Sequence, residues 1–125
     1  MPLNKYAPQV ATHRRTQSAI LEATKALIAT NGLKKMSMIE IADASEVSRA
    51  TLYNHYRDKE SVIFALCESE LARLVEIAQN APDTTSALER ISLQVSSDPA
   101  LAAMRVQDPD QLALALAKAA EKSLI

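Results

Sequence analysis

The segment Ser37 to Lys59, SMIEIADASEVSRATLYNHYRDK, restricts the fold of this chain more than any other part. Ser37 precedes an apolar run and Glu40 follows three residues later, which is the capping-box pattern that begins a helix. Ser48 is a second N-cap candidate, and Ser45 to Val47 form a short connection before it. The segment therefore predicts two short helices joined by a tight turn, with a further helix beginning just after them.

The apolar positions of these two helices predict how they pack. Ile41 and Ala42 lie on the first helix, and the short side chain of Ala42 lets a second helix cross closely at a steep angle. Leu52 and Tyr56 are spaced i and i+4, so they share one inward face of the second helix. This is the layout of a helix-turn-helix, and the opposite face of its second helix is left for a partner.

That outer face carries donors, acceptors and small groups: Ser48, Arg49, Ala50, Thr51, Asn54 and His55. Such groups suit the edges of base pairs in the major groove of double-stranded DNA. Tyr53 and Lys59 fit contacts to the phosphate backbone, which position a protein without specifying a sequence. For Tyr53 the alternative is that it fills the small core of the motif. The pattern predicts a DNA-binding helix over residues 49–55.

The run from Thr16 to Phe64 resembles the N-terminal domain of the TetR family of bacterial transcriptional regulators. The resemblance lies in AILEATKALIATNG, then IADASEVS, then RATLYNHYRDKES, in the family's order and spacing. TLYNHY followed by a Lys-Glu pair is more specific than a bare helix-turn-helix. The resemblance implies a homodimeric repressor that binds a palindromic operator, controlled through the angle of a long connecting helix.

The first helix of the motif is expected over Thr16 to Thr30, because apolar residues recur there at helical spacing and Asn31-Gly32 supplies a left-handed stop. In the family's docking mode Thr16 and Gln17 at its start, and Ser37 at the next helix, direct free N–H groups at phosphates. The alternative for these three residues is a merely local cap.

The turn departs from the family at Glu46, where members usually have Gly in a left-handed backbone conformation. A residue with a Cβ costs roughly 1 kcal/mol in that conformation. The motif is expected to survive this cost, with a slightly reshaped turn.

The whole chain is predicted to be all-α, in three parts. Residues 1–15 are expected to be a flexible basic arm whose Lys5, Arg14 and Arg15 contact DNA, or a tail with no role. Residues 16–57 form the DNA-binding head. Residues 58–125 form a helical region, with helices expected over 58–79, 85–95, 99–106 and 109–123. Capping patterns mark the last three starts, at Ser86 with Glu89, at Asp98-Pro99 and at Asp108-Pro109.

The final helix carries a stripe of small and apolar residues, which we predict to form the dimer interface: Leu112, Leu116, Ala119 and Ala120. Members of the family continue for several more helices that enclose an effector pocket, so a small-molecule effector is not the leading expectation here. The sequence does not separate a compact regulator from a truncated one. The alternative function is a helical interaction module that keeps the head and pairs with another regulator.

The charge is divided unevenly along the chain. Residues 1–60 contain nine Lys or Arg and six Asp or Glu, whereas residues 61–125 contain five and nine. A basic head and an acidic body suggest that the head alone approaches DNA, since phosphates attract basic groups. The alternative is a chance scatter of solvated charge.

The residue inventory excludes other classes of protein. The chain has one Cys and two His, with no glycine-rich phosphate loop and no metal-ligand spacing, so neither an enzyme nor a bound cofactor or metal is expected. A single cysteine forms no internal disulfide, and no apolar run reaches the roughly 18 residues that span a bilayer. A cytoplasmic protein without membrane contact is predicted.

Overall fold

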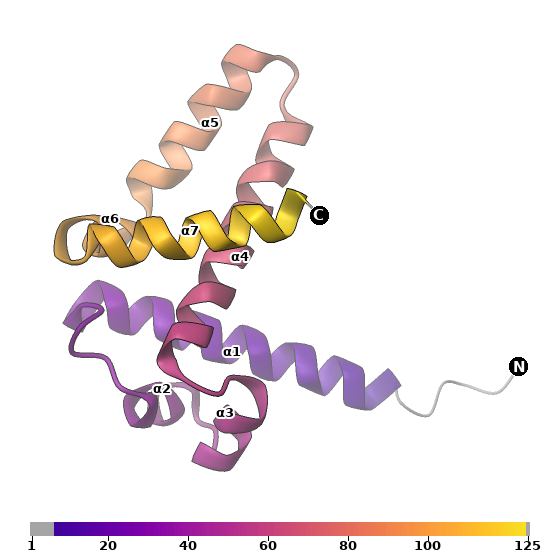
Figure 1. Cartoon of the computed structure of the whole chain (residues 1–125). Helices are drawn as coiled ribbons and strands as arrows, with labels where there is room; N and C mark the ends of the chain where they lie inside the picture. The colour runs from indigo at the N-terminus through magenta and orange to yellow at the C-terminus, as the bar shows by residue number, and fades with distance from the viewer. Residues whose placement is uncertain (1–6, 125) are drawn as a thin grey trace, which may run out of the picture.

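The computed structural model describes residues 7–124, and these form seven helices (Figure 1). The head contains α1 (Ala7–Asn31), α2 (Met38–Ser45) and α3 (Arg49–His55). The body contains α4 (Lys59–Asn80), α5 (Thr84–Ser97), α6 (Pro99–Gln107) and α7 (Pro109–Leu124). The prediction of an all-α chain is confirmed over the described residues. No helix among them is long and apolar enough to cross a bilayer.

The head is held together by apolar side chains from all three of its helices. Ile20 and Ile28 of α1, Ile41 of α2 and Leu52 of α3 are each 0% exposed. Full burial of such side chains contributes about 1.5 to 3 kcal/mol each. The predicted inward positions of Ile41, Ala42 and Leu52 are confirmed, and Tyr56 is half-buried beside them.

The turn between α2 and α3 has the predicted left-handed residue. Glu46 has φ 59° and ψ 37°, and its N–H donates to the carbonyls of Ala42 and Asp43. Gly32, which ends α1, has φ +83°. Both positions therefore stop a helix in the conformation that the sequence indicated.

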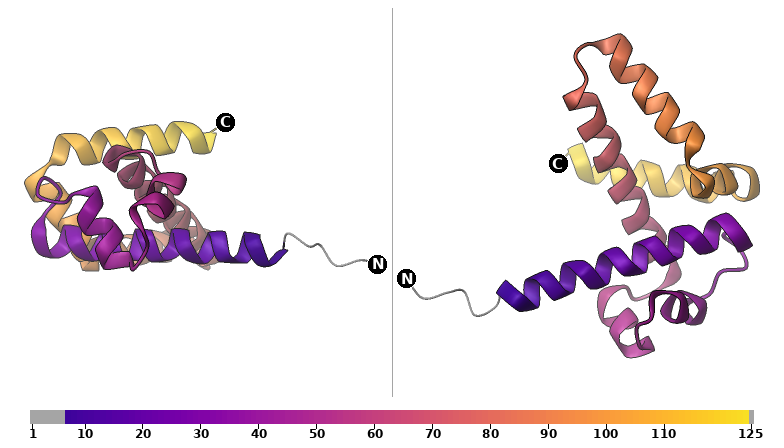
Figure 2. Two further views of the ribbon diagram at one scale, coloured as in Figure 1. Left: turned by 90° about the horizontal axis from the view of Figure 1, so that it is seen from below. Right: turned by 180° about the vertical axis from the view of Figure 1, so that it is seen from behind.

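The start of α1 corrects the predicted flexible arm. The helix begins at Ala7, nine residues before Thr16, so residues 7–15 are helical, while Lys5 lies outside the described residues. Pro8 lies in the first turn, where a missing N–H breaks no hydrogen bond. Residues 10–15 are exposed, and this end of α1 projects past the other helices (Figures 1 and 2). A helix that buries no face there has no apolar period for the sequence to reveal.

The body is organised around α4, which leaves the head and runs up the molecule (Figure 1). The helix, expected from residue 58, begins at Lys59, and Asp58 caps it through a 2.8 Å bond from the Ser61 N–H. The far half of α4 and α5 form a two-helix hairpin, while α6 returns to the head. The cap of α5 is Asp83, which accepts from the Ser86 N–H at 2.7 Å; the predicted cap at Ser86 is therefore wrong. The predicted starts of α6 and α7 are confirmed.

The predicted dimer stripe on α7 is mostly packed within its own chain. Ala119 is 0% exposed, and Leu112 and Leu116 are half-buried against the core that α4 shares. Ala120 alone of the four is exposed. Small side chains allow α7 to cross close to α4, and this intramolecular contact covers most of the surface that the sequence assigned to a second copy.

Candidate nucleic-acid interface

The candidate DNA-binding surface is the outer face of α3, and a local cap fixes the start of that helix. The Ser48 Oγ accepts from the Thr51 N–H at 3.0 Å and donates to the Thr51 Oγ1 at 2.9 Å. Leu52, one residue later, anchors the helix in the core. A capped start and a buried centre hold this short helix in place without contacts on its outer side.

The structure places most of the predicted base-contacting residues on that outer side. Arg49, Ala50 and Asn54 are exposed, and Tyr53 is 52% exposed. Thr51 is half-buried, because its hydroxyl turns to Ser48. We call the strip formed by Arg49, Ala50, Tyr53 and Asn54 the α3 strip. It presents a guanidinium, a phenol and a carboxamide, which are the groups that hydrogen-bond to base edges and phosphates.

His55 departs from the predicted strip, because its ring packs against α1. The ring centroids of His55 and His13 are 4.3 Å apart at an interplanar angle of 30°. The His55 Nδ1 is buried and has no hydrogen-bond partner among the described residues. One edge of the ring is therefore turned toward α1, and a contact between His55 and a base remains a prediction. Sequence analysis missed the partner, because His13 fell in the segment that was taken for a flexible arm.

This histidine pair makes the stability of the head depend on pH. Burial first, and then the nearby His13, lower the pKa of His55 below its usual 6.5. A lowered pKa means that the folded state favours the neutral ring, so the stabilisation is complete above pH 6.5 and is lost as pH falls below it.

We expect the melting temperature to fall when the pH is lowered from about 7.5 to about 5, and to fall less in His13→Ala. Thermal denaturation followed by circular dichroism at closely spaced pH values measures this effect. The lowered carboxyl pKa values of Asp58 and Asp83 act in a separate window, near and below 3.8. An identical loss in His13→Ala and wild type would contradict the role of the pair.

Of the residues predicted to contact phosphates from a helix start, Ser37 lies at such a start and Thr16 and Gln17 do not. Thr16 lies well inside α1, so neither it nor Gln17 offers a free N–H at a helix end, and that prediction is wrong. Ser37 caps α2, its Oγ accepting from the Glu40 N–H at 3.2 Å. The Lys59 Nζ donates to the Lys34 carbonyl at 3.5 Å and lies near the α1–α2 loop.

That loop adds two basic residues that sequence analysis did not single out. Lys34 and Lys35 are both exposed, and Lys34 is placed beside Lys59 by the bond just described. Arg14 and Arg15 are exposed on the projecting end of α1. The head therefore carries exposed cations on α1, on this loop and on α3, which is the charge that a DNA backbone attracts.

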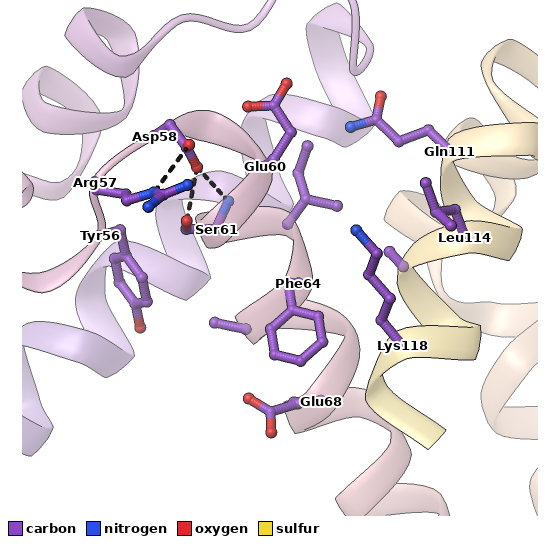
Figure 3. A pocket seen from close by; sticks show the side chains of 13 residues that line it. Tyr56, Arg57, Asp58, Glu60, Ser61, Phe64, Glu68, Gln111, Leu114 and Lys118 are labelled. Atoms are coloured by element: carbon purple, nitrogen blue, oxygen red, sulfur yellow. Dashed lines mark hydrogen bonds and ion pairs between the residues drawn. The ribbon is translucent and has the colours of Figure 1, made fainter. Parts of the chain in front are cut away.

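Two hollows in the described part of the body have linings that do not suit nucleic acid. A groove of about 490 Å³ lies between the first turns of α4 and α7 (Figure 3). The carboxylates of Asp58, Glu60 and Glu68 outnumber the two cations, Arg57 and Lys118, in its lining, which disfavours phosphates. A second cavity of about 280 Å³ lies among α4, α5, α6 and α7, with mostly leucine and alanine walls. The sequence did not lead us to expect an effector pocket, yet the body contains this cavity.

Cys67 lies in the same body, at the centre of α4. It is 1% exposed, and burial raises the pKa of its thiol to about 11. A buried, protonated thiol is a weak nucleophile. Cys67 therefore fills part of the hydrophobic core.

Known proteins resemble this chain both in sequence and in fold. Residues 20–66 match the family model described as bacterial regulatory proteins, tetR family. Over 78 residues, 62% of this chain and 40% of the relative, the sequence is 25% identical to a fatty acid metabolism regulator protein from Bacillus subtilis strain 168.

Two solved structures have the same fold over most of this chain. The fatty acid degradation regulator FadR from Bacillus halodurans superposes with a TM-score of 0.68 at 24% identity, covering 86% of this chain and 61% of that one. A TetR-family transcriptional regulator from Haemophilus influenzae gives a TM-score of 0.62 at 18% identity, covering 77% and 57%. This chain spans less than two thirds of the length of each of these relatives.

Proposed function

We propose that this chain, whose residues 20–66 match the family model of bacterial regulatory proteins, tetR family, is a sequence-specific DNA-binding transcriptional regulator that acts as a homodimeric repressor on a palindromic operator. The observation that carries the proposal is the α3 strip, which is exposed on a capped helix with its inner face buried. Bacterial regulators of this family bind DNA and are not enzymes.

The strip suits direct recognition of bases. An arginine binds the O6 and N7 of guanine through two hydrogen bonds, and an asparagine binds the N6 and N7 of adenine in the same way. In the proposed complex Arg49 and Asn54 contact bases, while Tyr53, Lys59 and Lys34 contact phosphates. The cations of the head supply affinity that does not depend on sequence.

Two heads are needed because one short helix contacts few base pairs. When a second head is tethered to the first, its binding becomes effectively intramolecular and the affinity rises. Two recognition helices about 34 Å apart enter successive major grooves on one face of the duplex. Large apolar side chains such as Leu88, Leu93 and Val106 are exposed in the body and offer surface that association can bury.

The apolar cavity of the body is the effector site in this proposal. Its volume of about 280 Å³ lies at the small end of the range for ligand pockets, so it fits a short apolar group. Two of the relatives are named as regulators of fatty acid metabolism and degradation. An acyl chain is therefore the effector class that we propose.

The proposal is tested by the mass of the protein in solution together with an unbiased selection of bound DNA. We expect a mass twice that of the 13.6 kDa chain, and enrichment of inverted repeats with half-site centres about 34 Å apart. A monomer that associates with a different regulator would instead favour the interaction-module alternative. Failure to enrich any sequence would contradict the proposal.

A further inference from the structure

Lys25 joins the head to two separate elements of the body. It lies on α1, and its Nζ is 2.8 Å from the Glu70 Oε1 and 2.9 Å from the Asp98 Oδ2. The Lys25 side chain is 24% exposed, while those of Glu70 and Asp98 are 10% and 2% exposed. We call these three residues the Lys25 clamp. Partial removal from water makes such ion pairs stronger than those on an open surface.

The two carboxylates belong to different helices, so the clamp ties three elements together. Glu70 lies on α4, and Asp98 is the N-cap of α6. The Asp98 Oδ1 accepts from the N–H groups of Ala100 at 2.9 Å and Leu101 at 3.2 Å, while its Oδ2 faces Lys25. One aspartate therefore fixes both the start of α6 and the position of α1.

The ammonium of Lys25 is what keeps these carboxylates together. Burial by itself lowers the pKa of Lys25, but the hydrogen bonds and attraction of Glu70 and Asp98 outweigh it and raise that pKa above 10.5. Without the lysine, two buried carboxylates would face each other with no cation between them, which is costly.

A second contact joins the same helices farther along. A Cβ added at Gly32, just after α1, would collide with the side chain of Gln107 at the end of α6. The helix α6 therefore touches α1 near both of its own ends, at Asp98 and at Gln107. The angle of α1 against the body is fixed by these contacts.

We propose that Lys25 is a positioning residue for DNA recognition, which sets the angle of the head against the body through Glu70 and Asp98. This inference rests on the proposed function. In a dimer joined through its bodies, the head angle determines the separation of the two recognition helices. Lys25 itself lies on α1 and is absent from the α3 strip, so it acts on half-site spacing and leaves base contacts unchanged.

The test compares two duplexes, one with a single half-site and one with the selected inverted repeat. We expect Lys25→Met to lose about tenfold or more in affinity for the inverted repeat, because a poorly held second head has a lower effective concentration. Affinity for the single half-site should stay unchanged. Lys25→Arg, which keeps a cation between the carboxylates, should retain the wild-type preference. Lys118→Met removes the same charge from α7 and serves as the matched control.

Glu70→Gln covers the case in which Lys25→Met fails to fold, because it weakens one of the two pairs and leaves Asp98 in place. It should lose part of the preference for the inverted repeat. Equal losses on both duplexes, or an unchanged preference in folded Lys25→Met, would overturn the positioning role while leaving the proposed function standing. A wild-type protein with no preference for the inverted repeat would overturn the proposed function and the positioning role together.

Discussion

Leu52→Ala lowers the free energy of unfolding by about 2 to 5 kcal/mol, the cost of removing a fully buried leucine and leaving a cavity. Leu52 is 0% exposed at the centre of α3, where it attaches the recognition helix to the rest of the head. We expect DNA binding to be lost with it, since Leu52 is the one fully buried side chain of α3. Urea denaturation followed by circular dichroism measures the change.

Leu93→Ala is the matched control for this substitution. Leu93 is 70% exposed on α5, so the same chemical change there should alter stability by no more than about 0.5 kcal/mol. Affinity for a duplex with a single half-site should not change, because Leu93 lies on α5, outside the head. Similar losses for the two variants would show that α3 is not held by Leu52 in the way described.

Arg49→Ala is expected to reduce discrimination between the selected operator and single-base variants of it by about 1 to 3 kcal/mol, or roughly 5- to 150-fold. The reason is that a two-bond contact to one base pair carries sequence information. Asn54→Ala should relax specificity at a different base pair. Fluorescence anisotropy with a panel of single-base operator variants measures both effects.

Lys59→Ala is the counterpart of these substitutions, because the loss of a phosphate contact weakens binding to all DNA sequences alike. It should also reduce the slope of log affinity against log salt by about 1. If Arg49→Ala, Asn54→Ala and Lys59→Ala gave equal losses on every duplex, the division between base and phosphate contacts would be wrong.

The sequence predicted those parts of the fold that depend on neighbours along the chain. The predicted caps at Ser37 and Ser48 are interactions over three residues, and the structure confirms both of them. The left-handed Glu46 follows from the same kind of local pattern. Local hydrogen bonds and turn residues leave a direct trace in sequence, so the head could be outlined from it.

The parts that were missed depend on contacts between distant residues. Residues 10–15 of α1 are exposed, so no apolar period marked this stretch as helix. The stripe on α7 was predicted to form the dimer interface, but a sequence pattern does not tell whether an apolar surface meets its own chain or another copy. The inward turn of His55 required knowledge of where His13 lies.

The candidate site also has a part that follows from local sequence and a part that depends on distant residues. The α3 strip follows from the position of Ser48 and the period of one helix, and its contacts with DNA remain a prediction. The Lys25 clamp unites residues up to 73 positions apart in sequence, and no spacing rule connects them. Its charges are unremarkable in the sequence, where lysine and glutamate are common on the surface of any helix.

Because α1 is long and straight, a small tilt of the helix at the Lys25 clamp gives a larger displacement at its far end. Lys25 grips the helix, and His13, which supports the end of α3, lies about 18 Å away along the axis at 1.5 Å per residue. A tilt of about 5° at the grip moves that support by about 1.6 Å over this length. A small change in packing around Glu70 therefore produces a larger displacement at the His13 end of α1. Displacements of this size decide whether a side chain of the α3 strip reaches its base.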